Sequence, residues 1–313
     1  AVLTKDVGIV CYSDWTNPED GKCKVVNMAQ DPPTYGDAAV LTLATTEDLS
    51  AGKSGKAQRF AMSRFSDTLA VVCYTPFGDQ VGVPVCRTLT VSDENALSAG
   101  SEFEFVPNST TDVYTMSLES LTEDRGVLCF QDTSAVTAQN VRNVVCTILQ
   151  VSGESLSVPE RIFNETTLEF LAGSGWTYVN VVSLNNIQAI SLAVLSETAA
   201  VVCYNDGTGL APDKEPTTFC NKLAVTSESL SIGGAYDLGA GKDWSPNTGS
   251  KAVSVAAFSD TDGVACVCND DEGPVCTPLD LLHDDIGQAG EPLQIGDNGD
   301  HCREVTDLQA VSY

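Results

Sequence analysis

The sequence has little positive charge and almost no histidine. Of its 313 residues, 16 are lysine or arginine and 43 are aspartate or glutamate, which gives a formal net charge of −27. Such a chain repels phosphate backbones and anionic lipid surfaces, so we expect no nucleic-acid partner and no direct membrane insertion. The two histidines, His283 and His301, fall in polar stretches, so a Ser-His-Asp triad is not indicated.

Long apolar runs are also missing. No run approaches the ~20 residues that a membrane-spanning helix needs. The sequence has no glycine-rich phosphate-binding loop and no CxxC pair with a histidine at zinc-ligand spacing. It therefore predicts neither a nucleotide site nor a cysteine-based metal centre. The first residue is Ala1, and no signal peptide is recognisable, so we expect a processed or trimmed product.

Cysteine is abundant. The chain has twelve cysteines, and an even number in so acidic a chain indicates disulfides and an oxidising compartment. Two N-x-[ST] sequons, at Asn108 and Asn164, agree with a secretory route and are candidate glycosylation sites. Buried free thiols in a reducing compartment are the alternative.

Five segments share one pattern, in which an apolar residue, a Ser or Thr and a short polar turn precede a β-branched run that ends in cysteine. They read VLTKDVGIVCY, RFSDTLAVVCY, SLTEDRGVLCF, VLSETAAVVCY and AFSDTDGVACV. A second cysteine follows each first one, with aliphatic or thioether residues three and five positions later. The first cysteines are Cys11, Cys73, Cys129, Cys203 and Cys266. A repeat of this length is typical of an array of small units, and this one predicts an all-β chain.

Each repeat predicts four short strands. Examples of the four, in order, are Lys251 to Phe258, Ala70 to Tyr74, Cys86 to Val91, and a strand after the turn Leu97 to Gly100. A tight polar turn joins the first two strands, as in a hairpin. The second strand is apolar on both faces, which is expected of a strand packed between neighbouring sheets.

The two ends of the chain together complete one repeat. Gln309 to Tyr313 (QAVSY) followed by Ala1 to Thr4 (AVLT) matches Lys251 to Ser259 (KAVSVAAFS) position for position. The number of residues from Cys266 through the C-terminus and on to Cys11 is similar to the four spacings between successive first cysteines. We therefore predict a single domain over residues 1–313, a five-bladed β-propeller of four-stranded blades whose ring is closed by the C-terminal strand. An open solenoid is the alternative.

The cysteines predict a set of disulfides. The distance along the chain between the two cysteines of a repeat varies although both are always present, which indicates a bond across the base of a variable loop. The five predicted pairs are Cys11 with Cys23, Cys73 with Cys86, Cys129 with Cys146, Cys203 with Cys220, and Cys266 with Cys276. The remaining Cys268 and Cys302 fall in connections expected on one face, so we predict a sixth bond that pins the C-terminal strand. A free catalytic thiol is then not expected.

Charged residues are rare on the first strand of each repeat, which lines the central channel of a propeller. The exceptions are Arg64, Glu119 and Asp307. We interpret them as a salt bridge near the channel mouth, with a glycosidase carboxylate set as the alternative.

Acid-rich loops have the oxygen ligands that calcium prefers, and the candidates are Asp14, Asp206 and Asp270. None of these loops has the full EF-hand spacing. Turn formation by Asp, Asn and Gly explains the same residues. We therefore predict no cofactor, with calcium as the alternative.

The pattern SxTxAVVCYxD…C…LxVSxxxLSxG resembles repeats in uncharacterised dinoflagellate proteins and, more loosely, cysteine-free repeats of bacterial surface proteins. It covers essentially the whole chain. The resemblance implies an algal-type repeat β-protein and no particular activity, and it adds the thylakoid lumen to the extracellular space as an expected location. Two positions depart from the pattern. Pro76 lies where other repeats carry an Asp, and in the fifth repeat Val267 lies where the other repeats carry an aromatic residue.

Four aromatic residues, Trp15, Trp176, Tyr178 and Trp244, fall in connections expected on one face. Exposed aromatic residues among polar ones are typical of surfaces that anchor proteins or stack on sugars. The loops differ between repeats, which suits an irregular protein partner better than five equivalent sugar pockets. We therefore predict a non-enzymatic binding or scaffold module that docks onto a protein or a membrane-associated complex on its extracellular or lumenal side. A carbohydrate-binding lectin and a glycoside hydrolase are the alternatives.

Overall fold

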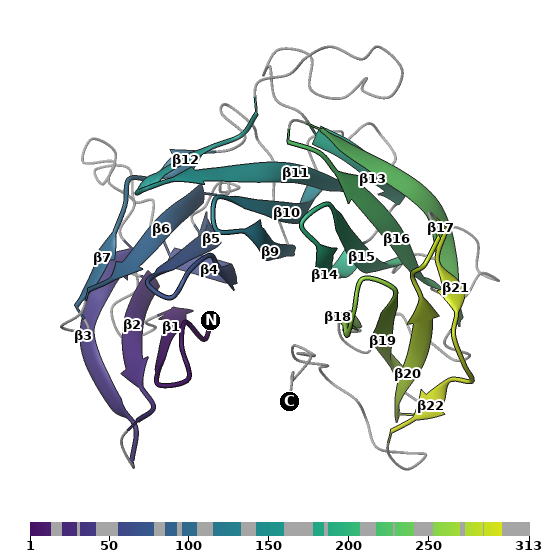
Figure 1. Ribbon diagram of the computed structural model, residues 1–313, viewed down its shortest axis with the longest axis horizontal. Coiled ribbons are helices and arrows are strands. Elements are labelled where there is room, and N and C mark those ends of the chain that lie inside the picture. Colours follow the sequence, from purple (N-terminus) through teal and green to yellow (C-terminus); the bar gives the residue numbers. More distant parts are fainter. Residues whose placement is uncertain are drawn as a thin grey trace. The chain divides into compact units, whose positions relative to one another are not determined.

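The computed structural model shows five β-sheets (Figure 1). It describes residues 1–13, 21–29, 32–41, 56–77, 85–92, 96–104, 115–132, 142–159, 178–184, 187–206, 217–227, 229–240, 253–269, 273–283 and 285–295. Every regular element in these ranges is a strand, which confirms the all-β prediction. Over the same ranges, no helix has the length and apolar character that crossing a membrane requires.

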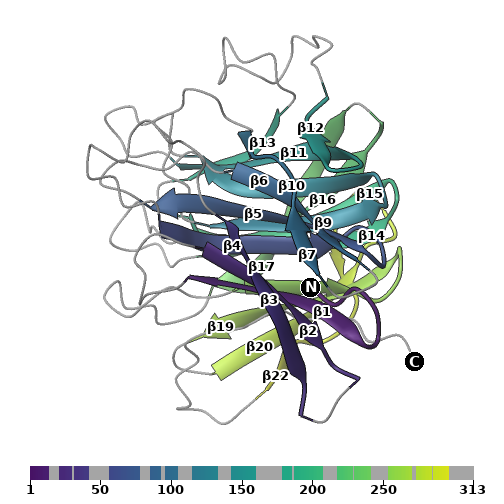
Figure 2. The same cartoon turned by 90° about the vertical axis from the view of Figure 1, so that its left-hand side faces the viewer.

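Within each sheet the strands follow in chain order, and every pairing with a described register is antiparallel. The first sheet contains β1 (Val7–Ser13), β2 (Gly21–Asn27) and β3 (Thr34–Leu41). The second contains β4 (Lys56–Arg64), β5 (Leu69–Phe77), β6 (Val85–Val91), β7 (Leu97–Ala99) and β8 (Phe103–Glu104). Figures 1 and 2 both show β4, β5 and β6 as neighbouring strands.

The other three sheets repeat this order. The third contains β9 (Met116–Thr122), β10 (Arg125–Asp132), β11 (Arg142–Ser152), β12 (Ser155–Ser157) and β13 (Tyr178–Leu184). The fourth contains β14 (Ile187–Ser196), β15 (Ala199–Asp206), β16 (Thr217–Val225) and β17 (Leu230–Ala240). The fifth contains β18 (Val253–Ala257), β19 (Asp262–Asn269), β20 (Gly273–Asp280), β21 (Gly287–Gln288) and β22 (Leu293–Gln294).

The outer strand of the predicted repeat is divided in three sheets. In the second sheet, β7 pairs with β6 at Leu89 to Val91, and β8 pairs with the other end of β6 at Val85 and Cys86. The third and fifth sheets divide the outer strand in the same way, into β12 and β13 and into β21 and β22. An outer strand bonds to one neighbour only, so it can leave the sheet and return without breaking the pairing of the inner strands.

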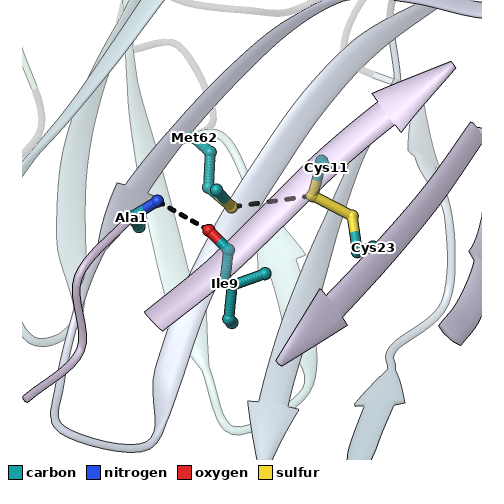
Figure 3. Close-up of a disulfide and its surroundings, with 5 residues drawn as sticks. All are labelled: Ala1, Ile9, Cys11, Cys23 and Met62. Carbon is teal, nitrogen blue, oxygen red and sulfur yellow. Dashed lines mark hydrogen bonds between the residues drawn. A yellow bond between two sulfur atoms is a disulfide. The ribbon is translucent and has the colours of Figure 1, made fainter. Parts of the chain in front are cut away.

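The first residues of the chain occupy inner-strand positions of the first sheet. Val2 forms a bridge with Gly8, as Arg64 does with Ala70 in the second sheet. The Ala1 amino group donates to the Ile9 carbonyl at 3.0 Å (Figure 3). The Ile9 amide in turn donates to the Ala1 carbonyl at 2.8 Å. The predicted continuation of this strand, residues 309–313, lies outside the described residues.

The chain divides into two compact units. The first comprises Ala1–Val113, Leu118–Gly126 and Leu149–Pro159, and the second comprises Tyr114–Ser117, Val127–Ile148 and Glu160–Tyr313. The assignment of residues 1–313 to one domain therefore stays a prediction.

Each unit contains a core between two successive sheets. In the first unit, Leu3, Ile9 and Val25 of the first sheet pack with Val72 and Leu89 of the second. In the second unit, Leu195 and Val201 of the fourth sheet pack with Ala265, Leu279 and Leu281 of the fifth. In the second and fourth sheets the middle of the second strand is buried on both faces, as the sequence predicts, because Val71, Val72, Val201 and Val202 have no exposed surface.

Disulfides join the second and third strands of the repeat in all five sheets, and in the first sheet these strands are β1 and β2. They are Cys11–Cys23, Cys73–Cys86, Cys129–Cys146, Cys203–Cys220 and Cys266–Cys276, the five pairs that the sequence predicts. In the first sheet the bonded residues are direct cross-strand partners, and Met62 of β4 lies beside them (Figure 3). The Met62 Sδ is 3.7 Å from the Cys11 Sγ, and because a disulfide sulfur carries no hydrogen, we treat this as a packing contact.

Candidate functional site

A groove of about 610 Å³ lies in the first unit, beside the β4–β5 turn and the β9–β10 turn. Its lining residues come from the ends of the two hairpins and are Arg64, Phe65, Ser66, Asp67, Thr68, Ser120, Leu121, Thr122 and Glu123. The volume lies within the range of small-molecule sites. Four of the nine residues carry hydroxyl groups and three are charged, so the groove offers mostly polar contacts.

Two apolar side chains are buried beneath this polar lining. Phe65 is 4% exposed and Leu121 is 8% exposed. Both are the last residues before the Ser or Thr of their turns, where the repeat pattern requires an apolar side chain. Their burial fixes the ends of β4 and β9 and thereby the positions of the neighbouring polar residues.

Local hydrogen bonds shape the two turns. In the β4–β5 turn, the Phe65 amide donates to the Leu69 carbonyl at 2.8 Å, and the Thr68 amide donates to the Ser66 hydroxyl at 3.3 Å. In the β9–β10 turn, the Thr122 hydroxyl donates to the Asp124 carboxylate at 2.6 Å. Serine and threonine commonly stabilise turns in this way, which explains their recurrence at these positions.

Charge in the groove comes mainly from one ion pair. Arg64 donates to Asp67 within the β4–β5 turn. Both side chains are exposed, so the pair adds little stability and remains accessible to a ligand. The sequence singled out Arg64, but it did not predict the partner, because the interpretation paired Arg64 with acids on other inner strands. Glu123 adds a second exposed carboxylate to the lining.

Glu119 is held beside the groove by the neighbouring inner strand. The Ser63 hydroxyl of β4 donates to the Glu119 carboxylate of β9 at 3.2 Å and accepts from the Ser120 amide at 3.0 Å. Ser63 is buried and Glu119 is half-buried. The arrangement places a carboxylate directly before Ser120, a lining residue. Asp307, the third predicted channel residue, lies outside the described residues.

The predicted aromatic surface falls almost entirely outside the described residues. This applies to Trp15, Trp176 and Trp244. Tyr178 begins β13, where its backbone pairs with Thr147 of β11, and its side chain is not described. The protein-docking surface therefore stays a prediction.

The other predicted sites lie mostly outside the described residues as well. These are Asn108, Asn164, Asp14, Asp270 and Cys302. Asp206 and Cys268 lie in strands β15 and β19, and their side chains are not described. Among the residues that the structure describes, no group of three or more His, Cys, Asp or Glu side chains could hold a metal ion.

Sequence reasoning missed the groove, although its parts are visible in the sequence. The turn sequences FSDT (Phe65 to Thr68) and LTED (Leu121 to Asp124) were interpreted only as polar connections. The available signal was their content of hydroxyl groups and charges, together with Arg64 at the end of an inner strand. That the two turns share a groove depends on how successive sheets pack, which the spacing of repeats alone does not specify.

No family model and no curated protein matches the chain. Among solved structures, an α-L-arabinanase of Penicillium chrysogenum complexed with arabinobiose is 11% identical with a TM-score of 0.45, covering 96% of this chain and 82% of that chain. An α-L-arabinofuranosidase of Fusarium graminearum is 10% identical with a TM-score of 0.46, covering 88% and 81%. The β-propeller domain of Nup133 from Vanderwaltozyma polyspora is 7% identical with a TM-score of 0.37, covering 94% and 91%.

These comparisons correct the prediction of a non-enzymatic module. The two higher-scoring of these three structures are glycoside hydrolases, so the prediction that the chain is not an enzyme is withdrawn. The prediction rested on differences between loops, and a repeated scaffold with variable loops is compatible with either role. At these identities and TM-scores, the likeness assigns neither an activity nor a substrate to this chain.

Proposed function

We propose that the chain is a carbohydrate-active protein of the glycoside hydrolase class and that the groove at the β4–β5 and β9–β10 turns binds the glycan. The observation that carries the proposal is the groove itself, in which hydroxyl groups and the Arg64–Asp67 pair lie over the buried Phe65 and Leu121. Such polar groups match a neutral polyhydroxylated ligand. The net charge of −27 disfavours a polyanionic one.

Hydrolysis requires two carboxyl groups on opposite sides of the scissile bond. Asp67 and Glu123 line the groove, and Glu119 directly precedes the lining residue Ser120 in β9. Of these, Glu119 is held by a hydrogen bond from another strand, that from Ser63, and a positioned carboxylate is what this chemistry needs. We therefore assign Glu119, with Glu123 as the second carboxyl group, to the chemical step and Asp67, with Arg64, to glycan binding.

The test is a panel of neutral oligosaccharides and polysaccharides, including arabinan, assayed both for binding and for release of reducing ends. Asp67→Asn should weaken binding about tenfold, because it breaks the Arg64 pair at the groove. The matched control is Asp260→Asn, since Ser259 to Thr261 repeats the turn sequence Ser66 to Thr68 outside the groove. Glu119→Gln should abolish hydrolysis and leave binding in place.

Three outcomes are decisive. Hydrolysis that is lost in Glu119→Gln but not in Asp260→Asn supports the proposal. Binding without hydrolysis by the unmodified chain overturns the hydrolase assignment in favour of a lectin. Failure to bind any neutral glycan overturns the proposal as a whole.

We also propose that the five sheets are the blades of a propeller and that residues 309–313 complete the inner strand begun by Ala1 to Leu3. Support comes from the bridge between Val2 and Gly8, which has the register of the inner strands in the other sheets. Val10 and Met28 of the first sheet are 40% and 38% exposed, whereas the equivalent Val72 and Val91 are buried. Phe258 of the fifth sheet is 64% exposed, whereas the equivalent Phe65 is buried. Closure of the ring would cover these apolar side chains.

Five disulfides fit an oxidising environment. Secretion or an organelle lumen, including that of the thylakoid, is part of the proposal, as is the algal origin that the repeat pattern implies. A docked protein partner stays a prediction that rests on Trp15, Trp176 and Trp244.

A further inference from the structure

Serine hydroxyl groups link successive inner strands within each unit. In the first unit, Ser63 of β4 accepts a hydrogen bond from the Ser120 amide of β9 at 3.0 Å. In the second unit, Ser117 of β9 accepts from the Leu192 amide of β14 at 3.1 Å. Ser191 of β14 in turn accepts from the Val255 amide of β18 at 3.0 Å. Inner strands of different sheets are therefore joined by a side chain that binds a backbone amide.

Two of these links share one register. Ser191 lies opposite the first cysteine of its sheet, Cys203, and Ser117 holds the same place in the repeat sequence. The donors are Leu192, which directly follows Ser191, and Val255, which directly follows Ser254. In both links the donor is therefore the residue that follows the serine position of the next repeat. The rule predicts, for any repeat with this serine, which amide of the next inner strand it binds.

Ser254 of β18 is the next serine in this series. It lies opposite Cys266, just as Ser191 lies opposite Cys203, and it is 3% exposed. A hydroxyl this deeply buried is normally hydrogen-bonded. By the register rule, its donor is the residue after the serine of the following inner strand.

Only one segment after β18 repeats the inner-strand pattern. Val311-Ser312-Tyr313 aligns with Val253-Ser254-Val255 and with Ile190-Ser191-Leu192. Residues 296–308 provide a connection of similar length to residues 105–115, which join β8 to β9. The segment can therefore reach the inner side of the fifth sheet as the earlier inner strands reach theirs.

We infer that residues 311–313 dock beside β18 and that the Ser254 hydroxyl accepts a hydrogen bond from the Tyr313 backbone amide. The site on the protein is the inner strand of the fifth sheet, and its partner is the C-terminal segment of the same chain. This inference rests on the proposed ring and is independent of the glycan groove. It names the contact that fixes the last strand.

The test is amide hydrogen exchange followed by NMR on the full chain labelled with [15N]tyrosine. The Tyr313 amide should be protected, and Ser254→Ala should speed its exchange at least tenfold. The Tyr204 amide, in the middle of β15, is the internal reference and should not change. Ser259→Ala removes an exposed turn serine from the same sheet and is the matched control.

The outcomes separate this inference from the proposals above. Fast exchange of Tyr313 in the unmodified chain overturns the docking of the segment, whatever the glycan assays show. Protection that Ser254→Ala leaves unchanged overturns the serine contact and leaves the ring standing. Dimerisation with protected Tyr313 only in the dimer would show that the segment docks onto a second copy, which also overturns the inference.

Discussion

In the fourth sheet, the residue after the second cysteine is hydrogen-bonded to the aromatic residue after the first. In the fourth sheet, the Tyr204 hydroxyl donates to the Asn221 side-chain oxygen at 2.8 Å, and the Asn221 amide group donates to the Gly233 carbonyl at 3.0 Å. In the third sheet the corresponding residues are Phe130 and Thr147. In the fourth sheet a buried hydroxyl thus occurs with an amide oxygen that accepts its hydrogen bond, and the third sheet has neither the hydroxyl nor the amide.

This matching predicts a compensating pair of substitutions in the fourth sheet. Tyr204→Phe should lower the free energy of unfolding by about 1–2 kcal/mol, because it removes the donor to a buried amide oxygen. Adding Asn221→Thr, which copies the pair in the third sheet, should restore much of the loss. Urea unfolding of the single and double variants measures both effects. A double variant that is less stable than Tyr204→Phe alone would contradict the matching.

The buried Tyr74 of the second sheet should make the free energy of unfolding of the chain fall at alkaline pH. Burial raises the pKa of its hydroxyl, the nearby Arg87 lowers that pKa, and Glu102 raises it, with a net upward shift. Since the unfolded chain then loses this proton first, the stabilising effect is complete below about pH 10 and declines as the pH rises from there towards the folded-state pKa. Tyr74→Phe should flatten the fall in unfolding free energy between about pH 10 and 11.5. The exposed Tyr35→Phe is the control, and an equal slope in both variants would contradict the assignment.

At the scale of strands, the start of β10 packs tightly against the preceding sheet. A Cβ at Gly126 would lie 2.7 Å from the Phe65 ring and 2.8 Å from the Glu119 carbonyl. The second of these atoms is backbone of the paired strand β9 and cannot move aside easily. Glycine at this position therefore permits the approach of the two hairpins whose turns line the groove.

Gly126→Ala should consequently destabilise the chain by about 1–3 kcal/mol. Gly287→Ala is the matched control in a strand, because the nearest atom to its Cβ is 3.6 Å away. Thermal unfolding of the two variants is the measurement. Equal melting temperatures would show that the first unit tolerates the added methyl group.

The sequence predicts the inner parts of the repeat better than its edges. The second and third strands and the five disulfides follow from the β-branched runs and the cysteine pairs, because neighbouring sheets bury these positions from both sides. The division of outer strands such as β7 and β8 could not be predicted, since an outer strand has only one bonded neighbour. The groove could not be predicted either, because Arg64 and Glu123 belong to different repeats and line one groove only through the packing of two sheets.

At the scale of the whole molecule, the proposed ring predicts the effect of a truncation. Deleting residues 305–313 should lower the melting temperature and promote aggregation, because the inner edge of the first sheet would lose its strand and β18 of the fifth sheet would lose the segment docked beside it. Differential scanning calorimetry with light scattering measures both. A truncated chain that melts like the full one, without aggregating, would contradict closure.

The proposed glycan site is the groove in the first unit. The most direct measurement is a crystal structure with the tightest-binding neutral oligosaccharide from the panel. We expect a sugar ring seated between the β4–β5 and β9–β10 turns, with its hydroxyl groups on Arg64, Asp67 and Thr122 and its scissile bond beside Glu119. An oligosaccharide bound elsewhere, with this groove empty, would contradict it.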